Sequence, residues 1–166
     1  MGSLKHIPVC WQEDDYKNLA YVSKGGYLHP NLLDYTNEPY KTIINNDVYT
    51  LPNPMPKFID TILEHFDFDI KAPAFNRTPP GNVLPLHSDT YEVYSKVYNV
   101  KDLDSITRYI IFLEDSQPGH LMQIENEVWS TWSAGDYVSW QGTTKHAAYN
   151  IGSKQRYTLQ ITCANN

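Results

Sequence analysis

His87, Asp89 and His146 are the residues of this chain whose types and spacing could do metal chemistry. His87 and Asp89 stand two apart at the end of a run, residues 83–89, that predicts a strand. Alternate residues of a strand share a face, so the imidazole and the carboxylate could enter one cavity. His146 lies in another predicted strand and adds a second imidazole. Two histidines and one carboxylate leave positions open on a divalent metal, whereas a structural zinc site is closed by four protein ligands.

Each of these three residues also has an ordinary structural interpretation. Taken alone, His87 could cap a loop, Asp89 could begin a turn, and His146 could be a hydrogen-bonded core histidine. The agreement of the three types in one order favours an open metal centre that is catalytic.

Arg156 and Thr158 form a second pair of interest, shortly after His146. They stand two apart in a predicted strand and so share a face. An arginine fork binds a carboxylate through two hydrogen bonds, and a neighbouring hydroxyl can add a third. This arrangement suits the far carboxylate of a dicarboxylic molecule whose other end chelates the metal.

These motifs resemble a known superfamily. His87-Ser88-Asp89, then His146, then Arg156-Tyr157-Thr158 is similar to the His-x-Asp, His, Arg-x-Ser/Thr pattern of non-haem iron(II)- and 2-oxoglutarate-dependent oxygenases. The segments that begin at Arg108 and at Gly135 resemble the double-stranded β-helix core of those enzymes.

Within that superfamily the chain most resembles the aspartyl/asparaginyl β-hydroxylase and proline-hydroxylase-like branch. The resemblance covers roughly residues 72–163 and rests on residues 77–81, 123–129 and 132–136. Some members of that branch lack the metal-binding carboxylate, whereas Asp89 is present here. The substrate of the branch therefore does not carry over to this chain.

The resemblance implies iron(II) on His87, Asp89 and His146, with 2-oxoglutarate and O₂ as co-substrates. It implies Arg156 and Thr158 as ligands of the far carboxylate, and hydroxylation of a C–H bond as the usual outcome. The substrate would be an amino-acid residue, peptidyl or free, or a small metabolite. A cupin-type metal-dependent hydrolase or isomerase, and a jelly-roll binding protein without turnover, are the alternatives.

Other residues carry open interpretations. Arg108 could bind the first carboxylate of the co-substrate or a substrate carboxylate, or form a surface ion pair; Arg77 has the same possibilities with weaker support. The tyrosines of residues 90–105 could line a lid or simply pack, and the tryptophans favour core positions: Tyr91, Tyr94, Tyr98, Trp129, Trp132 and Trp140. His6, His29 and His65 are expected to be structural or exposed. His120 follows a Pro-Gly turn and is interpreted as a surface histidine, with a position in the cavity as the alternative.

The elements that must position these residues are short strands. Eight runs separated by turn residues follow position 73, and they predict an all-β jelly roll of the cupin-like kind, a double-stranded β-helix. The runs cover residues 74–78, 83–89, 107–113, 121–125, 128–132, 136–140, 146–151 and 156–162. We expect residues 72–166 to form the catalytic core and residues 1–71 an irregular cover with one helix over 56–66. Residues 90–105 are expected to form a long loop.

Composition narrows the class of protein further. The chain has 166 residues and a net charge of −6, which suits one domain and disfavours a nucleic-acid partner. No apolar run is long enough to span a bilayer, and no signal peptide is seen at the start. Two cysteines, expected to be reduced thiols, fit a cytoplasmic protein. The sequence gives no indication of oligomeric state.

Overall fold

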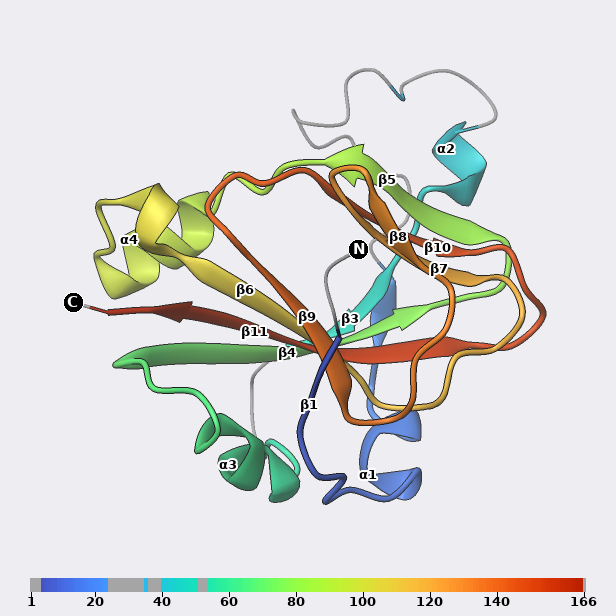
Figure 1. Ribbon diagram of the computed structural model, residues 1–166, viewed down its shortest axis with the longest axis horizontal. Helices are drawn as coiled ribbons and strands as arrows, with labels where there is room; N and C mark the ends of the chain where they lie inside the picture. The colour runs from blue at the N-terminus through green and yellow to red at the C-terminus, as the bar shows by residue number, and fades with distance from the viewer. Residues whose placement is uncertain (1–3, 24–34, 36–39, 51–53, 166) are drawn as a thin grey trace.

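The computed structural model describes residues 4–23, 35, 40–50 and 54–165, which form two antiparallel sheets (Figure 1). The larger sheet has the order β1-β9-β6-β11-β4-β3-β2, and the smaller has the order β5-β10-β7-β8. The larger sheet contains β1 (Lys5–His6), β2 (Val22–Ser23), β3 (Asp47–Tyr49), β4 (Ile70–Thr78), β6 (Thr107–Phe112), β9 (Asp136–Gln141) and β11 (Arg156–Ala164). The smaller sheet contains β5 (Asn82–His87), β7 (His120–Ile124), β8 (Glu127–Trp129) and β10 (His146–Asn150).

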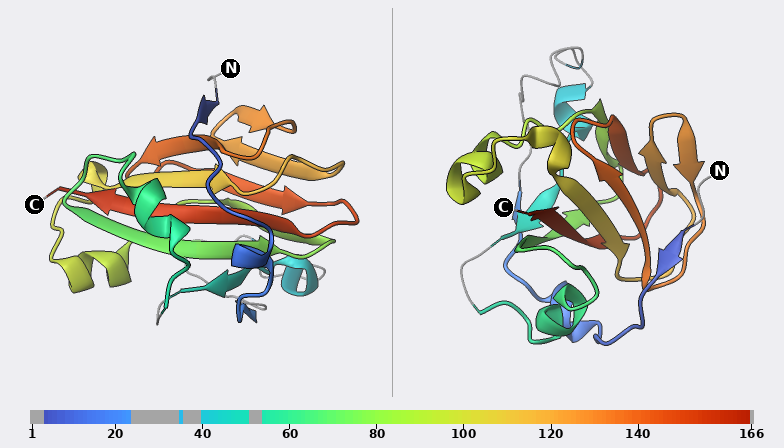
Figure 2. Two further views of the ribbon diagram at one scale, coloured as in Figure 1. Left: turned by 90° about the horizontal axis from the view of Figure 1, so that it is seen from below. Right: turned by 60° about the vertical axis from the view of Figure 1, so that its left-hand side comes forward.

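The two sheets pack face to face and confirm the predicted jelly roll (Figure 2). Side chains between them form a core rich in tryptophan, because rings of this size fill the space between two sheets well. This inner core consists of Ile110, Phe112, Met122, Trp129, Trp132, Val138 and Trp140. The tryptophans were expected in the core, and all three are buried.

Strand β11 shows how alternation divides the molecule into two sides. Leu159, Ile161 and Cys163 belong to a second core on the outer face of the larger sheet. The alternate positions Arg156 and Thr158 are buried on the opposite, inner face. The strand thus carries apolar residues outward and polar residues into the space between the sheets.

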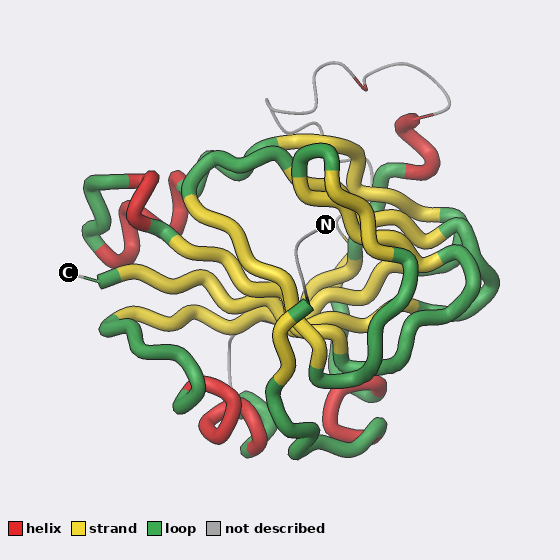
Figure 3. The backbone as a smooth tube through the Cα atoms, in the orientation of Figure 1, coloured by secondary structure: helices red, strands yellow, loops and turns green. Residues whose placement is uncertain are grey.

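The outer core is covered by the N-terminal segment and by helix α3 (Phe58–Leu63), as Figure 3 shows below the larger sheet. Phe58, Ile59 and Ile62 of α3 are buried, in the three- and four-residue spacing that predicted this helix. The helix is shorter than the predicted 56–66. The other helices are α1 (Asp14–Lys17), α2 (Tyr40–Ile43) and α4 (Glu92–Tyr98). Within the described part of the chain, no helix has the length and apolar character needed to cross a membrane.

The N-terminal cover is more regular than the sequence suggested. Strand β1 pairs with β9 at one edge of the larger sheet, and β3 and β2 extend the other edge beyond β4. These strands are two or three residues long, too short for an alternating pattern to be visible in the sequence. His29 lies outside the described residues.

Each of the eight predicted runs contains a strand, with shifted ends. Strand β4 begins at Ile70, ahead of the predicted start, and β8 ends at Trp129 rather than 132. Strand β5 ends at His87, so Asp89 lies just beyond it and not within it. The side chains of His87 and Asp89 still come together, because the chain after β5 keeps Asp89 beside the end of that strand.

The expectation of a long loop over residues 90–105 is wrong. The segment contains α4 and a 3₁₀ turn, Leu103–Ser105. Tyr91 precedes the helix and Asn99 follows it, both in the left-handed region with φ of 53° and 56°. Tyr91 is buried with Val100, Ile106 and Ala164 in a small cluster of its own. Tertiary packing, rather than helical periodicity in the sequence, therefore fixes this helix at the end of the barrel.

Candidate active site

His87, Asp89 and His146 converge beside the paired strands β5 and β10, as their spacing predicted. One ligand atom from each residue lies within 4.8 Å of the others. The Nε2 atom of His87 is 3.9 Å from one Asp89 oxygen, and that of His146 is 3.6 Å from the other. In the ladder between β10 and β5, His146 lies directly opposite His87. Strand pairing thus brings together two residues that are far apart in the sequence.

The hydrogen bonds of both histidines leave the same nitrogen available. The Nδ1 atom of His87 lies 2.7 Å from the Pro85 carbonyl, and that of His146 lies 3.0 Å from the Thr144 carbonyl. A carbonyl oxygen can only accept, so each Nδ1 carries the proton and donates it. Each Nε2 therefore keeps its lone pair, and both lone pairs are directed to the side of Asp89. Backbone carbonyls commonly orient metal-binding histidines in this way.

Burial favours the form of His146 that can bind a metal. Loss of hydration in this buried site is the main cause that lowers the pKa of His146 to about 4, and His87 and Arg108 act in the same direction. The Asp89 carboxylate opposes the shift without overcoming it. His146 is therefore neutral near pH 7, as a metal ligand must be.

His146 and Arg156 both line a cavity of about 50 Å³ between the two sheets. Its lining contains apolar and polar side chains. The apolar lining is Leu84, Ile110, Met122, Trp140 and Ala148, and the polar lining is Asn46, Asn76, Thr78, Thr158 and Gln160. The structure thus brings Arg156 and Thr158 to the same cavity as a triad histidine.

Arg156 is a buried cation without a matching anion. It is 3% exposed, and its closest polar contact is from a terminal nitrogen to the Met122 sulfur at 3.7 Å. Its Nε has no hydrogen-bond partner, and no carboxylate pairs with it among the residues that the structure describes. Burial lowers its pKa to about 10, so the guanidinium stays charged at neutral pH. Such a charge is costly unless a ligand supplies the missing acceptors.

Arg108 lies beside Asp89 of the triad and not on the surface. One terminal nitrogen is 3.2 Å from the second oxygen of Asp89, and the residue is 9% exposed. Its guanidinium carbon is 5.1 Å from the centre of the Tyr91 ring. The surface ion pair considered for Arg108 is therefore excluded, while the two carboxylate-binding roles remain open.

Arg77 points to the outer face of β4, away from the cavity. It donates two hydrogen bonds to one Asp47 oxygen, at 2.9 and 2.8 Å, and its guanidinium lies over the Tyr21 ring. The suggested carboxylate-binding role for Arg77 is therefore wrong. On an alternating strand, its neighbours Asn76 and Thr78 face the cavity instead.

The interpretation of His120 as a surface residue is also wrong. It is 2% exposed and its ring stacks near Trp132, at 6.3 Å between centroids. Its Nδ1 accepts from the Gln117 backbone N–H, and its Nε2 donates to the Lys154 carbonyl. A Pro-Gly turn before it suggested exposure, but the adjoining turn around Lys154 covers it. His6 and His65 are exposed as expected.

Some residues at the site had no signal in the sequence. Asn46 belongs to the N-terminal cover, yet it donates to Asn76 at 2.7 Å and accepts from Thr78 at 3.0 Å inside the cavity wall. No motif marks it, because its position depends on how β3 pairs with β4. Gln160 could have been found, since it stands two beyond Thr158 on the same face of β11.

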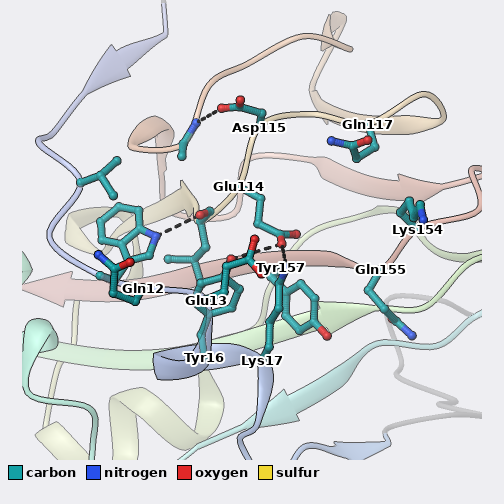
Figure 4. A pocket seen from close by; sticks show the side chains of 14 residues that line it. Gln12, Glu13, Tyr16, Lys17, Glu114, Asp115, Gln117, Lys154, Gln155 and Tyr157 are labelled. Carbon is teal, nitrogen blue, oxygen red and sulfur yellow. Dashed lines mark hydrogen bonds and ion pairs between the residues drawn. The ribbon is translucent and has the colours of Figure 1, made fainter.

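A larger cavity, about 670 Å³, lies elsewhere (Figure 4). It is formed by the N-terminal segment, the chain after β6 and the chain before β11, and no triad residue lines it. The close-up shows Tyr16 and Lys17 turned to Glu114; Lys17 is 2.6 Å from that carboxylate, and the Tyr16 hydroxyl donates to it at 3.2 Å. These groups satisfy one another, so the cavity offers no comparable chemistry.

Several solved structures match this chain in architecture. A Pseudomonas putida prolyl-4-hydroxylase matches with a TM-score of 0.58 and 15% identity, over 92% of this chain and 96% of that one. A predicted oxalate decarboxylase from Thermotoga maritima matches with a TM-score of 0.44 and 14% identity, over 72% of this chain and 81% of that one. A cupin domain of an Enterobacter cloacae XRE-family transcriptional regulator matches with a TM-score of 0.45 and 14% identity, over 73% of this chain and 98% of that one. At such identities the likeness shows the fold alone.

Sequence comparison identifies the family. A search of the curated proteins finds no significant match. A family model described as aspartyl/asparaginyl beta-hydroxylase matches residues 46–165, most of the chain. The matched region begins at the cavity residue Asn46 and contains the triad, Arg108 and Arg156. The chain therefore belongs to the aspartyl/asparaginyl β-hydroxylase family, a hydroxylase family with a cupin-type fold.

Proposed function

We propose that this protein is a non-haem dioxygenase dependent on iron(II) and 2-oxoglutarate. In the balanced reaction, substrate C–H, O₂ and 2-oxoglutarate give substrate C–OH, succinate and CO₂. The substrate would be an amino-acid residue, peptidyl or free, or a small metabolite. Membership of a hydroxylase family supports the reaction type, and the donor set supports the metal.

The single observation that carries the co-substrate assignment is the unpaired guanidinium of Arg156. It lines the same cavity as the triad residue His146. A ligand that contacts both residues needs a carboxylate for Arg156 and a chelating group for the metal. 2-Oxoglutarate has this pattern, with a far carboxylate and a keto acid. A cupin-type hydrolase or isomerase has no use for the buried arginine.

In this proposal the chain supplies binding and orientation, and iron(II), when bound, supplies activation of O₂ coupled to oxidative decarboxylation of the co-substrate. His87, Asp89 and His146 hold the metal from one side. Arg156 and the Thr158 hydroxyl, both almost fully buried, hold the far carboxylate. The cation remains protonated throughout, because even its lowered pKa is about 10.

The apolar wall of the cavity keeps water from the bound co-substrate. Ile110, Met122 and Trp140 each have less than a tenth of their surface exposed. Exclusion of water strengthens the pairing of Arg156 with a carboxylate, since electrostatic attraction grows as the local dielectric constant falls.

Succinate formation tests the proposal. Protein loaded with iron(II) and supplied with O₂ and 2-oxoglutarate should release succinate slowly even without substrate. Asp89→Ala should abolish the release by removing a metal ligand, and Arg156→Met should lower it at subsaturating co-substrate. Metal-loaded protein that releases no succinate and binds no 2-oxoglutarate would refute the proposal and favour a cupin-type hydrolase.

A further inference from the structure

The N-terminal cover contributes a polar side chain to the cavity shared by His146 and Arg156. Asn46 stands directly before β3, and the pairing of β3 with β4 brings it to Thr78. The next residue, Asp47, pairs with Arg77 on the outer face, so alternation turns Asn46 inward to the cavity. Asn46 is 7% exposed. A remote segment of the chain is thus fixed in the cavity wall.

Three polar side chains form a directed series of hydrogen bonds in this wall. The Thr78 hydroxyl donates to the Asn46 oxygen at 3.0 Å, and the Asn46 nitrogen donates to the Asn76 oxygen at 2.7 Å. An amide has one accepting and one donating end, so the donor from Thr78 fixes which way the Asn46 amide lies. Asn46 in turn occupies the oxygen of Asn76. The end of Asn76 that it leaves for a ligand is the nitrogen, which only donates.

The series ends beside the two residues that are proposed to hold the far carboxylate of the co-substrate. In the ladder between β4 and β11, Thr78 is the partner of Arg156, and Asn76 is the partner of Thr158. The side chains of such partners start about 4.5 to 5.5 Å apart on one face of a sheet. All four residues line the same cavity. A carboxylate that contacts Arg156 and Thr158 therefore lies within reach of the Asn76 amide.

The charge of the lining favours an anion in this cavity. Among the described residues that line it, Arg156 is a cation and none is an aspartate or a glutamate. A donor from Asn76 adds to the attraction for a carboxylate. An amide oxygen in that place would repel the carboxylate, because both groups only accept. The orientation of one amide thus decides whether this wall favours or opposes binding.

We propose that Asn46 is a positioning residue that makes the cavity selective for a keto acid with a second carboxylate. It acts through Asn76: by occupying the Asn76 oxygen, it directs the amide nitrogen to the far carboxylate of the co-substrate. This inference rests on the proposed function, because it takes 2-oxoglutarate as the occupant of the cavity. It goes beyond that function by giving the N-terminal cover a part in the recognition of the co-substrate.

Two keto acids of equal chain length provide the test. 2-Oxoglutarate has the far carboxylate, whereas 2-oxopentanoate has a methyl group in its place and the same chelating end. Both are titrated calorimetrically into protein loaded with zinc, which has no redox chemistry. The parent should bind 2-oxoglutarate at least about 100-fold more tightly, since only this ligand forms charge-assisted hydrogen bonds to Arg156.

Asn46→Leu removes the series without adding charge, because leucine is close to asparagine in size and shape. It should weaken binding of 2-oxoglutarate about tenfold or more, which corresponds to one hydrogen bond to a charged acceptor, and change the affinity for 2-oxopentanoate less than about twofold. A purely structural role of Asn46 would weaken the binding of both ligands alike. Equal losses for the two ligands, or no loss for 2-oxoglutarate, overturn the inference.

Asn46→Asp reverses the series and preserves the shape of the side chain. The new carboxylate still accepts from Thr78 but cannot donate, so the Asn76 amide turns its nitrogen to that carboxylate and its oxygen to the cavity. Binding of 2-oxoglutarate should fall further than in Asn46→Leu, with a much smaller change for 2-oxopentanoate. Because the acceptor for Thr78 is kept, this variant also tests the inference if Asn46→Leu does not fold.

Asn45→Asp is the matched control for charge. It adds the same charge in the same segment, but Asn45 contacts Ser23 and Asp47 and does not line the cavity. Its affinity for 2-oxoglutarate should stay within about twofold of the parent value, because the added charge is outside the cavity wall and screened by solvent. A loss as large as that in Asn46→Asp would attribute the effect to charge alone and overturn the inference.

The same titrations separate this inference from the proposed function. A parent that prefers 2-oxoglutarate to 2-oxopentanoate, with the same preference in the Asn46 variants, retains the proposed function and loses the role of Asn46. A parent that binds neither keto acid overturns both.

Discussion

At the scale of single residues, two arginines that look alike in the sequence, the part-exposed Arg77 and the buried Arg156, act differently in the structure. Arg77 pairs with Asp47, which is 5% exposed, and that pair holds β3 against β4. Arg156 has only a methionine sulfur and aromatic faces around it. A buried charge without a partner contributes nothing to stability, so its role lies in binding.

Arg156→Met should weaken binding of 2-oxoglutarate about 100-fold or more and leave the free energy of unfolding unchanged or raised. The loss of affinity follows from removing two charge-assisted hydrogen bonds to the co-substrate, worth about 1.5 to 3 kcal/mol each. The gain in stability follows from replacing an unpaired buried cation by an apolar side chain of similar length. Calorimetric titration and thermal unfolding measure the two quantities.

Arg77→Met is the matched control and should show the opposite pattern. It leaves Asp47 buried without its cation, so the protein should lose about 2 kcal/mol or more of stability while 2-oxoglutarate affinity stays near the parent value. Equal effects of the two substitutions on co-substrate affinity would contradict the distinction between the two arginines.

The sequence was sufficient to predict that the triad residues lie together and that Arg156 and Thr158 share a face of one strand, because strand periodicity carries that information. It could not identify Asn46, which reaches the cavity only through the pairing of β3 with β4. It also misplaced His120, since a turn far along the chain covers it. Contacts between remote segments are the part that local pattern does not contain.

At the scale of elements, the turns that contain Gly119 and Gly152 lie against each other, shortly before the start of β11. Gly119 has a φ of +92°, and an added Cβ would lie 2.3 Å from the Gly152 nitrogen. The Ile151 N–H donates to the Gly119 carbonyl at 2.9 Å. This close approach sets the position from which β11 begins, and Arg156 is its first residue.

Gly119→Ala should destabilise the protein by about 3 kcal/mol or more, because backbone strain and a backbone clash add. Gly81→Ala is the comparison: its φ is +79°, but nothing lies within 4 Å of an added Cβ. We expect that substitution to cost about 1 to 2 kcal/mol from strain alone. Chemical denaturation of both variants measures the difference, and equal losses would exclude a role for the turn contact.

The turn around His120 gives the fold a dependence on pH. Burial lowers the pKa of His120 below its usual 6.5, so the unfolded chain takes up the proton first as pH falls. The free energy of unfolding should therefore decline as pH drops below about 6.5, by at most about 1.4 kcal/mol per pH unit for one group. Protonation would also break the bond that Nδ1 accepts from Gln117.

His120→Gln should flatten this dependence between pH 7 and pH 5. A glutamine keeps a donor for the Lys154 carbonyl and does not titrate. Denaturation at several pH values compares the two slopes, and identical slopes would show that His120 does not control stability in this range.

The strand pattern predicted the jelly roll and its eight core strands, while the helix α4 and the three short N-terminal strands were not predicted. Strands of two or three residues carry no readable period. Helix α4 exposes Val93 and Val97 and is held by tyrosine packing, so it lacks an apolar stripe directed inward.

At the scale of the whole molecule, the triad residues come from the smaller sheet and the adjoining loop, and Arg156 from the larger sheet. Iron(II) and 2-oxoglutarate together would therefore tie the two sheets to each other. At about 100 times the dissociation constant, a ligand adds about 2.7 kcal/mol to the free energy of unfolding.

Thermal unfolding should consequently occur several degrees higher with metal and 2-oxoglutarate together than with metal removed by a chelator. In Asp89→Ala the increase should be lost, because the co-substrate chelates only a metal that is held. An increase of the same size in the variant would show that the ligands stabilise the protein at another site.

The most direct test of the central claim is anaerobic titration of the iron(II)-loaded protein with 2-oxoglutarate, which follows the weak visible charge-transfer band of the chelate. We predict a saturable band in the parent and a band in Arg156→Met that requires at least about 100-fold more co-substrate. A parent protein with verified iron and no band at any co-substrate concentration would contradict the account.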